Sequence, residues 1–282
     1  MSKKKRIVGL CIWFGIMLVL LVAGLLAGGP AEKHGTIKEM MRDAVLHEDH
    51  KISLLGLMDV NPAVVSAFTV TAIVLLLAAV IRIFVIPKFS YIPGKFQMLL
   101  ELLVGYFDDL AKSNSPHRNK FLGAYVFAAG VYIFLSTIFE LFGFQGVTTH
   151  GLSISLPAPI SDINAAICMG CMSYGVIMSG GIASNGVKGV FLSLKEFSLP
   201  ISMSFRLFGA LLSGLLVTEL VYYSIGLSII LPVAVGVMFT LLHALIQTYV
   251  LTLLTSLFYG EVSEVHEKPK KERRKKKVKA EV

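Results

Sequence analysis

The run Ser204-Phe205-Arg206-Leu207-Phe208-Gly209 places one arginine well inside a long apolar segment, residues 197–223, and a second such segment follows at residues 228–259. Transfer of a guanidinium into a bilayer costs roughly 2.5 to 3.5 kcal/mol on insertion scales. Arginine cannot lower this cost by losing its proton. An arginine kept at this position therefore predicts a functional site inside the membrane.

Small and polar residues surround this arginine at helical spacing. Four small side chains share its helix face, namely Ser202, Gly209, Ala210 and Ser213. A face with so little bulk lets a second helix approach closely, and that helix can belong to another protein. The second long segment carries one polar stripe, formed by Thr240, His243 and Gln247. Antiparallel packing of the two segments would set this stripe opposite Arg206.

The composition is that of a polytopic membrane protein. The chain has 282 residues, of which 55% are hydrophobic, and it contains several charge-free runs of about twenty residues. The sequence offers no paired nucleophile and base, no phosphate-binding glycine loop and no metal cluster, so we expect no catalysis by this chain alone, no cofactor and no metal. Cys168 and Cys171 have a CxxC spacing, but small apolar packing is the favoured interpretation inside a membrane helix.

We expect an all-α integral membrane protein with about six spanning helices. The first four are expected at residues 7–27, 63–81, 121–142 and 162–182, and the two long segments complete the set. At 1.5 Å per residue these two would be roughly 40 and 48 Å long against a hydrocarbon core of about 30 Å, so they must tilt or bend as a hairpin. An amphipathic helix at residues 98–110 is expected in the membrane interface, and residues 184–195 are expected to form a short loop.

A single polytopic domain is expected. Residues 7–27 add an N-terminal helix to it, with a cleaved secretory signal peptide as the alternative. Residues 28–61 are expected to be extracytoplasmic, residues 62–260 to form the membrane core, and residues 267–282 to form a disordered basic tail. Lysine and arginine gather at both ends and in alternate loops, which predicts cytoplasmic termini. Beside a membrane, the tail indicates a cytoplasmic flank rather than a nucleic-acid patch.

Several blocks of the sequence resemble subunit a of the membrane (Fo) sector of F-type ATP synthases. Two of them lie in the long segments, at residues 196–209 and 245–255. The others are the proline, glycine, glutamine and glutamate pattern of residues 92–110, residues 134–141, and the run Pro159-Ile160-Ser161-Asp162-Ile163-Asn164. Together these blocks cover nearly everything from Val60 to His266.

The resemblance implies a stator subunit that faces a rotating ring of subunit c, in which each helical hairpin has one membrane carboxylate. Protons or sodium ions would enter through one half-channel, ride on the ring and leave through a second half-channel, and this flow would drive ATP synthesis. Arg206 would be the fixed charge between the half-channels, with Gln247 holding its guanidinium by a hydrogen bond. The peripheral-stalk subunit b as a partner and the bacterial plasma (inner) membrane as the location are further implications.

The resemblance also implies residues for the outer half-channel, because polar groups at this depth need water or one another. They are Glu219, His243, Glu140, Asp162 and Asn164. Thr240 is a further candidate for ion translocation, because it occupies a position that is often glutamate or histidine in the family. The sequence departs from the family pattern here: Ala210 stands where asparagine is usual, and Leu215 stands where many relatives have glutamate. Glu219 follows one turn after Leu215, which indicates that polar groups have moved along the same channel. Asp162 has a second interpretation as the N-cap of the helix that follows.

Two other classes stay open at this point. A stand-alone secondary transporter or ion channel predicts internal repeats and broken helices near the midplane, and the sequence shows neither clearly. A structural membrane scaffold would not need an arginine on a face of small residues. The sequence does not distinguish protons from sodium ions as the coupling ion.

Overall fold

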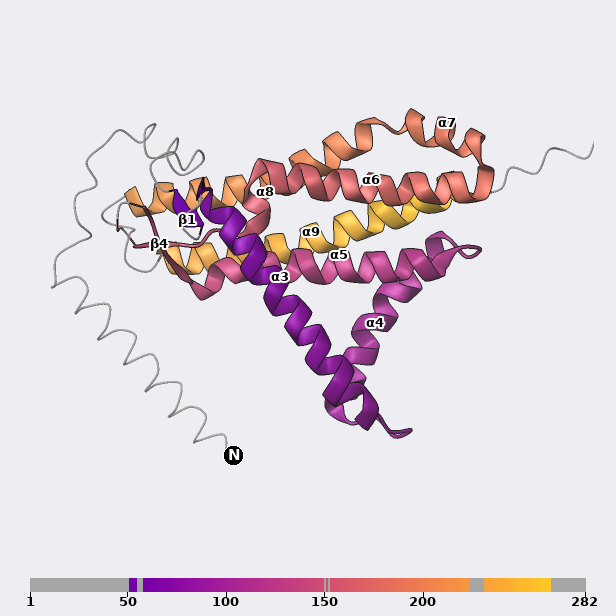
Figure 1. Cartoon of the computed structure of the whole chain (residues 1–282), viewed down its shortest axis with the longest axis horizontal. Coiled ribbons are helices and arrows are strands. Elements are labelled where there is room, and N and C mark those ends of the chain that lie inside the picture. The colour runs from indigo at the N-terminus through magenta and orange to yellow at the C-terminus, as the bar shows by residue number, and fades with distance from the viewer. Residues whose placement is uncertain (1–50, 55–57, 150, 152, 224–230, 265–282) are drawn as a thin grey trace, which may run out of the picture. The chain divides into compact units, whose positions relative to one another are not determined.

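The computed structural model describes residues 51–54, 58–149, 151, 153–223 and 231–264, and these are mostly helical (Figure 1). The elements, in chain order, are β1 (Ile52–Leu54), β2 (Met58–Val60), α3 (Pro62–Val80), η1 (Ile81–Val85), η2 (Ile86–Lys88), α4 (Lys95–Asn114), α5 (Asn119–Phe139), η3 (Glu140–Phe142), β3 (Gln145–Val147), β4 (Ser153–Ser155), η4 (Pro159–Ser161), α6 (Ile163–Asn185), α7 (Val187–Lys195), α8 (Ser198–Tyr223) and α9 (Leu231–Ser263).

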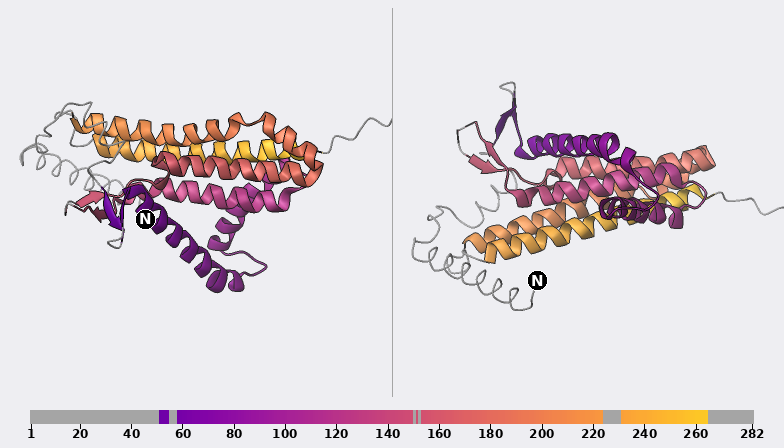
Figure 2. Two further views of the ribbon diagram at one scale, coloured as in Figure 1. Left: turned by 45° about the horizontal axis from the view of Figure 1, so that its top comes forward. Right: turned by 90° about the horizontal axis from the view of Figure 1, so that it is seen from below.

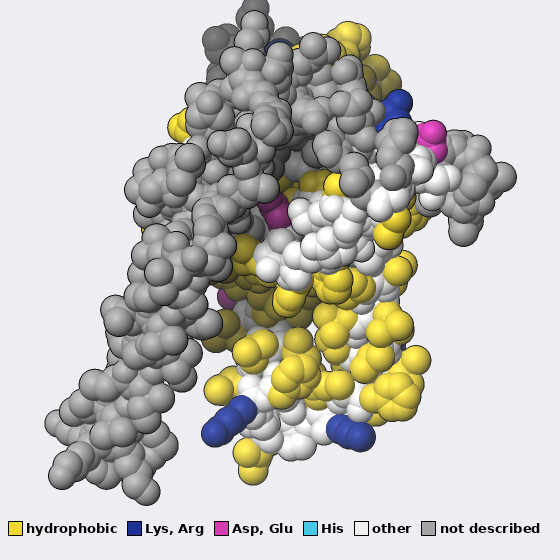
Figure 3. Space-filling model, turned by 90° about the vertical axis from the view of Figure 1, so that its left-hand side faces the viewer, with side chains coloured by type: hydrophobic (Ala, Val, Ile, Leu, Met, Phe, Trp, Pro, Cys, Tyr) yellow, Lys and Arg dark blue, Asp and Glu magenta, His cyan; other side chains and the backbone are white. Residues whose placement is uncertain are grey.

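Four stretches of the described chain are long and apolar enough to cross a membrane. They are Pro62–Lys88, Asn119–Phe142, Ile163–Asn185 and Val235–Ser263. A fifth crossing is formed by Val187–Lys195 and Ser198–Gly214, if this pair, bent by 48°, counts as one span. Figure 3 shows hydrophobic side chains over much of the part of this face that described residues form.

The predicted spans at residues 63–81, 121–142 and 162–182 are confirmed as helices. The two long segments are confirmed as the long helices α8 and α9. The predicted span at residues 7–27, most of the segment 28–61 and the basic tail at 267–282 lie outside the described residues.

The prediction of a loop at residues 184–195 was wrong. Gly186 ends α6 with a positive φ of 59°, and its N–H donates to the carbonyl of Ile182 at 2.8 Å, which is a usual way to close a helix. The helix α7 begins at the next residue. Val187, Phe191 and Leu194 recur there at helical spacing, an amphipathic pattern that outweighs the two lysines on which the loop was based.

The described chain forms two compact units. The first consists of the described parts of Met1–Lys88, Val131–Ala166 and Ser204–Thr248. Two short antiparallel hairpins belong to it: Ile52 pairs with Val60 in β1–β2, and Gln145 pairs with Ser155 in β3–β4. The residues that form its small core are Ile52, Val70, Phe139 and Leu156. The hairpins therefore pack against α3 and the end of α5.

The second unit consists of Phe89–Gly130, Ile167–Met203 and the described part of Tyr249–Val282. Its core includes Phe107, Leu122, Val126, Ile177 and Tyr259. Glycines permit close contact between its helices: a Cβ added at Gly180 would lie 2.5 Å from the ring of Tyr259, and one at Gly130 would lie 2.6 Å from the ring of Phe107. The close packing of this unit therefore depends on glycine at these positions as well as on the large side chains that fill its core.

The helix predicted at residues 98–110 is present as α4. The side chain of Gln97 joins the first turn of α4 to the preceding segment. Its Oε1 accepts the N–H of Ser90 at 3.1 Å, and its Nε2 donates to the carbonyl of Ser90 at 3.0 Å. Nε2 also donates to Glu101 Oε1 at 2.8 Å. These bonds explain locally why glutamine and glutamate follow the proline and glycine in this block. The location of α4 in the membrane interface stays a prediction.

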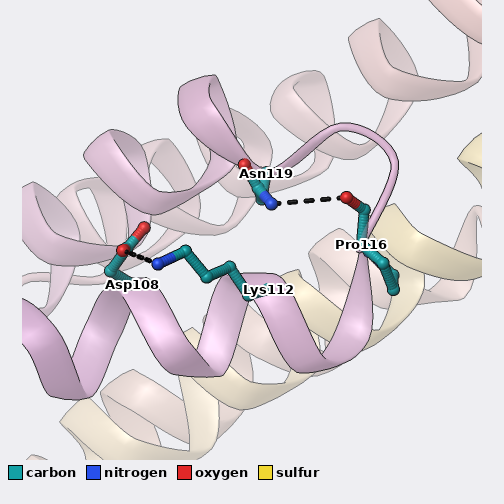
Figure 4. Close-up of polar contacts among 4 residues, drawn as sticks. All are labelled: Asp108, Lys112, Pro116 and Asn119. Atoms are coloured by element: carbon teal, nitrogen blue, oxygen red, sulfur yellow. Dashed lines mark hydrogen bonds and ion pairs between the residues drawn. The ribbon is translucent and has the colours of Figure 1, made fainter.

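The end of α4 carries an ion pair between Lys112 Nζ and Asp108 Oδ2 at 2.5 Å (Figure 4). The hydrogen bond from Lys112 to Asp108 raises the pKa of the lysine. In the turn that leads to α5, Asn119 Nδ2 donates to the carbonyl of Pro116 at 3.3 Å (Figure 4). Both contacts join residues that are close in sequence.

Candidate functional site

Arg206 lies on an exposed face of α8. The predicted small residues on this face are exposed or half-buried: Ser202, Gly209, Ala210 and Ser213. A Cβ added at Gly209 would meet nothing within 4 Å. The other side of the helix is buried, since Leu207 is 2% exposed and Leu211 is 7% exposed. The predicted small-residue face is therefore an open surface, and Arg206 lies on it.

The helix α9 runs antiparallel beside α8 (Figure 2). Gln247 is buried and bonds to Arg206. A Cβ added at Gly214 would lie 3.4 Å from Nδ1 of His243, so this imidazole packs against α8 two turns after Arg206. Thr240 is half-buried. The prediction that the stripe faces α8 is confirmed for Gln247 and His243.

The bond between Gln247 and Arg206 differs from the expected one in its direction, because a guanidinium can only donate to Gln247, whereas here Gln247 is the donor. Gln247 Nε2 donates to the main-chain carbonyl of Arg206 at 3.3 Å, whereas the guanidinium was expected as the partner. The reason is burial: Gln247 is 6% exposed, while the side chain of Arg206 is exposed. The amide therefore fixes the backbone of α8 behind the arginine and leaves the guanidinium for another partner.

No carboxylate among the described side chains forms an ion pair with Arg206. The side chain of Glu219, an outer half-channel candidate on the same helix, lies outside the described residues. A guanidinium in an apolar environment needs a counter-charge or water, because an unpaired charge there is costly. Among the described side chains, no carboxylate supplies this counter-charge.

Three further predicted residues lie in the same unit, on other elements. Glu140 begins η3 and is half-buried. Asp162 Oδ1 accepts the N–H of Asn164 at 2.7 Å, so it is the N-cap of α6, and Asn164 itself is exposed. Among the described residues, no hydrogen bond or ion pair joins these three to Arg206 or α9. The capping interpretation of Asp162 is confirmed, and a part for it in ion transport stays a prediction.

Two substitutions of Asp162 can distinguish its role as a helix cap from the role of its negative charge. Asp162→Asn keeps an Oδ1 acceptor for the N–H of Asn164, so we expect the thermal stability of the purified protein to stay unchanged. Asp162→Ala removes the acceptor and is expected to destabilise the protein by about 1 kcal/mol. Thermal unfolding in detergent measures both, and an equal loss in the two variants would contradict the capping contact.

Gly214 is the site residue that sequence reasoning missed. It allows the imidazole of His243 to approach α8, and the available signal was its position among the small residues of this helix, four after Ala210. Among the described residues, no group of three or more histidine, cysteine, aspartate or glutamate side chains could hold a metal ion. The site therefore consists of one exposed guanidinium, small residues around it and a buried amide behind it.

The fold and the site define an integral membrane protein in which two long antiparallel helices present, on a face of small residues, an arginine that pairs with no carboxylate among the described side chains. Residues 64–260 match the family described as ATP synthase A chain. This chain belongs to that family. It is accordingly a membrane protein of the Fo sector of F-type ATP synthase, where it works in a complex with the other Fo subunits.

Individual relatives agree with this assignment at low identity. ATP synthase subunit a of Cereibacter sphaeroides is 24% identical over 208 residues, which cover 69% of this chain and 80% of the relative. Subunit a of Beijerinckia indica is 24% identical over 241 residues, covering 77% and 94%. The protein named "ATP synthase subunit a, sodium ion specific" from Propionigenium modestum is 21% identical over 184 residues, covering 59% and 63%.

Proposed function

We propose that this chain is the stator that couples transmembrane ion flow to rotation of a ring of subunit c and so to ATP synthesis. It forms two ion half-channels beside the ring and contacts the peripheral-stalk subunit b. It lies in the bacterial plasma membrane with both termini in the cytoplasm. The residues 62–260 supply the stator core.

One observation carries this proposal, namely that Arg206 is exposed and has no described carboxylate partner. A membrane carboxylate on a passing ring helix is the chemical group that fits it, because the two opposite charges stabilise each other strongly where water is scarce. The small residues Ser202, Gly209, Ala210 and Ser213 permit that helix to come close. The open space at Gly209 supports such an approach.

The arginine acts in this scheme as a fixed charge that favours the ion-free form of the ring carboxylate. An ion-loaded carboxylate releases its ion when it meets the guanidinium, because the ion pair replaces the bound ion. A cation cannot pass this positive charge directly, so the two half-channels stay separate. Gln247 supports the arrangement by holding the main chain of α8 at the arginine.

The outer half-channel is assigned to polar residues of the first unit. They are Glu219 on α8, His243 and Thr240 on α9, Glu140 in η3, Asn164 in the first turn of α6, and Asp162, which directly precedes α6. The contact of His243 with α8 supports a polar route between α8 and α9. The coupling ion is either the proton or the sodium ion. The alternative of a stand-alone transporter is no longer favoured, because the chain is a member of an Fo subunit family.

A disulfide cross-link tests the ring contact. In a complex without Cys11, Cys168 and Cys171, Gly209→Cys is expected to form a disulfide with a cysteine on the outer helix of subunit c. Leu75→Cys on α3 is the control, since Leu75 is 64% exposed but lies outside the proposed ring face. Oxidation followed by electrophoresis shows the product. Equal cross-linking at both positions, or none at Gly209→Cys, would contradict the proposed face.

A further inference from the structure

One face of α7 packs tightly against α6. A Cβ added at Gly189 would overlap the carbonyl of Gly181, so the two helices meet backbone to backbone. The hydroxyl of Tyr174 on α6 donates to the carbonyl of Ser193 at 3.0 Å, and both Gly189 and Ser193 are buried. All of these residues belong to the second unit. The helix α7 is therefore a fixed part of this unit, and its opposite face points away from α6.

This opposite face, called here the outer face of α7, is apolar. Val187, Phe191 and Leu194 form it at helical spacing, and they are 74%, 66% and 47% exposed. Large apolar side chains grouped in this way indicate a contact with lipid or with a protein partner. The charged residues beside the outer face distinguish between these two kinds of contact.

Both charged side chains of α7 are positive. Lys188 and Lys195 lie two turns apart on one side of the outer face, and both are exposed. Among the described side chains, neither lysine forms an ion pair with a carboxylate. Glu196 follows directly after α7, but it is half-buried. An apolar face with lysines along its edge is typical of a helix at the boundary between acyl chains and headgroups, where lysines reach phosphate oxygens.

Further positive charge gathers at the start of α7. Arg118 is exposed and donates from Nη1 to the carbonyl of Ala183 at 2.7 Å, which places it at the junction of α6 and α7. Asn185 donates from Nδ2 to the carbonyl of Val262 at 3.0 Å, so α9 ends at the same junction. The sequence continues shortly afterwards to residues 268–277, which contain eight lysines and arginines and one glutamate. Clusters of this kind beside a membrane are attracted to anionic headgroups.

We infer that the outer face of α7, together with Lys188 and Lys195, is a binding surface for anionic phospholipids. The apolar side chains contact the acyl chains near the headgroups, and the two lysines bind the phosphate groups. Lipid fits this surface better than a neighbouring subunit does, because lysine is depleted in protein–protein interfaces. The inference goes beyond the proposed function, since it does not depend on ion coupling.

Photo-cross-linking identifies what covers this surface. The photoreactive residue benzoylphenylalanine replaces Phe191 in the assembled complex, which is placed in vesicles of equal amounts of phosphatidylglycerol and phosphatidylcholine. After irradiation, mass spectrometry identifies the cross-linked molecule, and we expect lipid adducts with phosphatidylglycerol favoured about fivefold. The control position is Leu75, which is 64% exposed on α3, a helix without charged residues. Both lipids are expected to react equally there.

Substitution of the two lysines separates charge from apolar contact. The double variant with Lys188→Gln and Lys195→Gln keeps the outer face, so lipid adducts are expected to remain while the two lipids become equally reactive. The double variant with Lys188→Arg and Lys195→Arg keeps the charge and is expected to keep the preference. Adducts at the Leu75 position in each variant show that the chain is inserted.

Three outcomes would overturn the inference. They are equal reaction of the two lipids with the native lysines, a preference for phosphatidylglycerol that persists without both lysines, and an adduct with protein in place of lipid at position 191. None of them bears on the proposed function, because the measurement identifies a bound molecule and does not follow ion pumping.

Discussion

Arg206→Ala is expected to reduce ATP-driven ion pumping to background while the nucleotide-hydrolysing head stays attached and active. Without the guanidinium, a ring carboxylate can pass between the half-channels with its ion still bound, and ions can leak directly from one side to the other. The measurement uses vesicles that contain the assembled complex, with a pH-sensitive dye and labelled sodium. The wild-type signal also identifies the coupling ion.

The direction of the stability change makes this prediction sharper. Burial of arginine in a bilayer costs roughly 2.5 to 3.5 kcal/mol on insertion scales, so alanine at this position should raise or preserve the amount of inserted protein. A residue kept only for stability would behave in the opposite way. Arg206→Ala is thus expected to separate the two quantities, with intact assembly and absent pumping.

Two variants serve as controls for Arg206→Ala. Lys188→Ala removes a positive charge from the exposed surface of α7 and is expected to leave pumping unchanged. Arg206→Lys keeps the charge but loses the planar group that binds a carboxylate through two N–H donors, so only weak pumping is expected. Normal pumping by Arg206→Ala would remove the central role given to this residue.

The sequence predicted the parts of the fold that depend on local hydrophobic pattern. The span expected at residues 63–81 is the helix Pro62–Val80, because a continuous apolar run has few other solutions in a membrane. The polar stripe of Thr240, His243 and Gln247 predicted which side of α9 faces α8, because residues three and four apart lie on the same side of a helix. Because Arg206 is exposed and Gln247 is buried, the partner of Gln247 is the main-chain carbonyl of Arg206 and not its guanidinium.

Contacts between helix ends that are far apart in the sequence could not be predicted from the hydrophobic pattern. His117 and Ser263 lie far apart in the sequence, and neither belongs to a periodic run that would point to the other. Their hydrogen bond depends on how α4, α5 and α9 pack, which is a tertiary property. The helix α7 was missed for a local reason, because Lys188 and Lys195 were given more weight than the apolar spacing of Val187, Phe191 and Leu194.

Gly189→Ala is expected to have a large effect on assembly. Its Cβ would lie 1.9 Å from the carbonyl oxygen of Gly181 and 2.3 Å from the carbonyl carbon. Both are backbone atoms of α6, so no side chain can rotate to make room. Overpacking in a core commonly costs about 1 to 3 kcal/mol, and a rigid backbone clash is at the upper end or beyond.

The gain in helix propensity does not offset this clash, since replacement of glycine by alanine inside a helix contributes only about 1 kcal/mol. The control is Gly175→Ala in α6, where a new Cβ meets nothing within 4 Å and the propensity gain acts alone. We expect Gly175→Ala to preserve or raise the thermal stability of the detergent-purified protein, and Gly189→Ala to prevent its accumulation in membranes. Equal behaviour of the two variants would show that α6 and α7 can separate without loss, and would contradict the close approach of Gly181 and Gly189 as a condition of the fold.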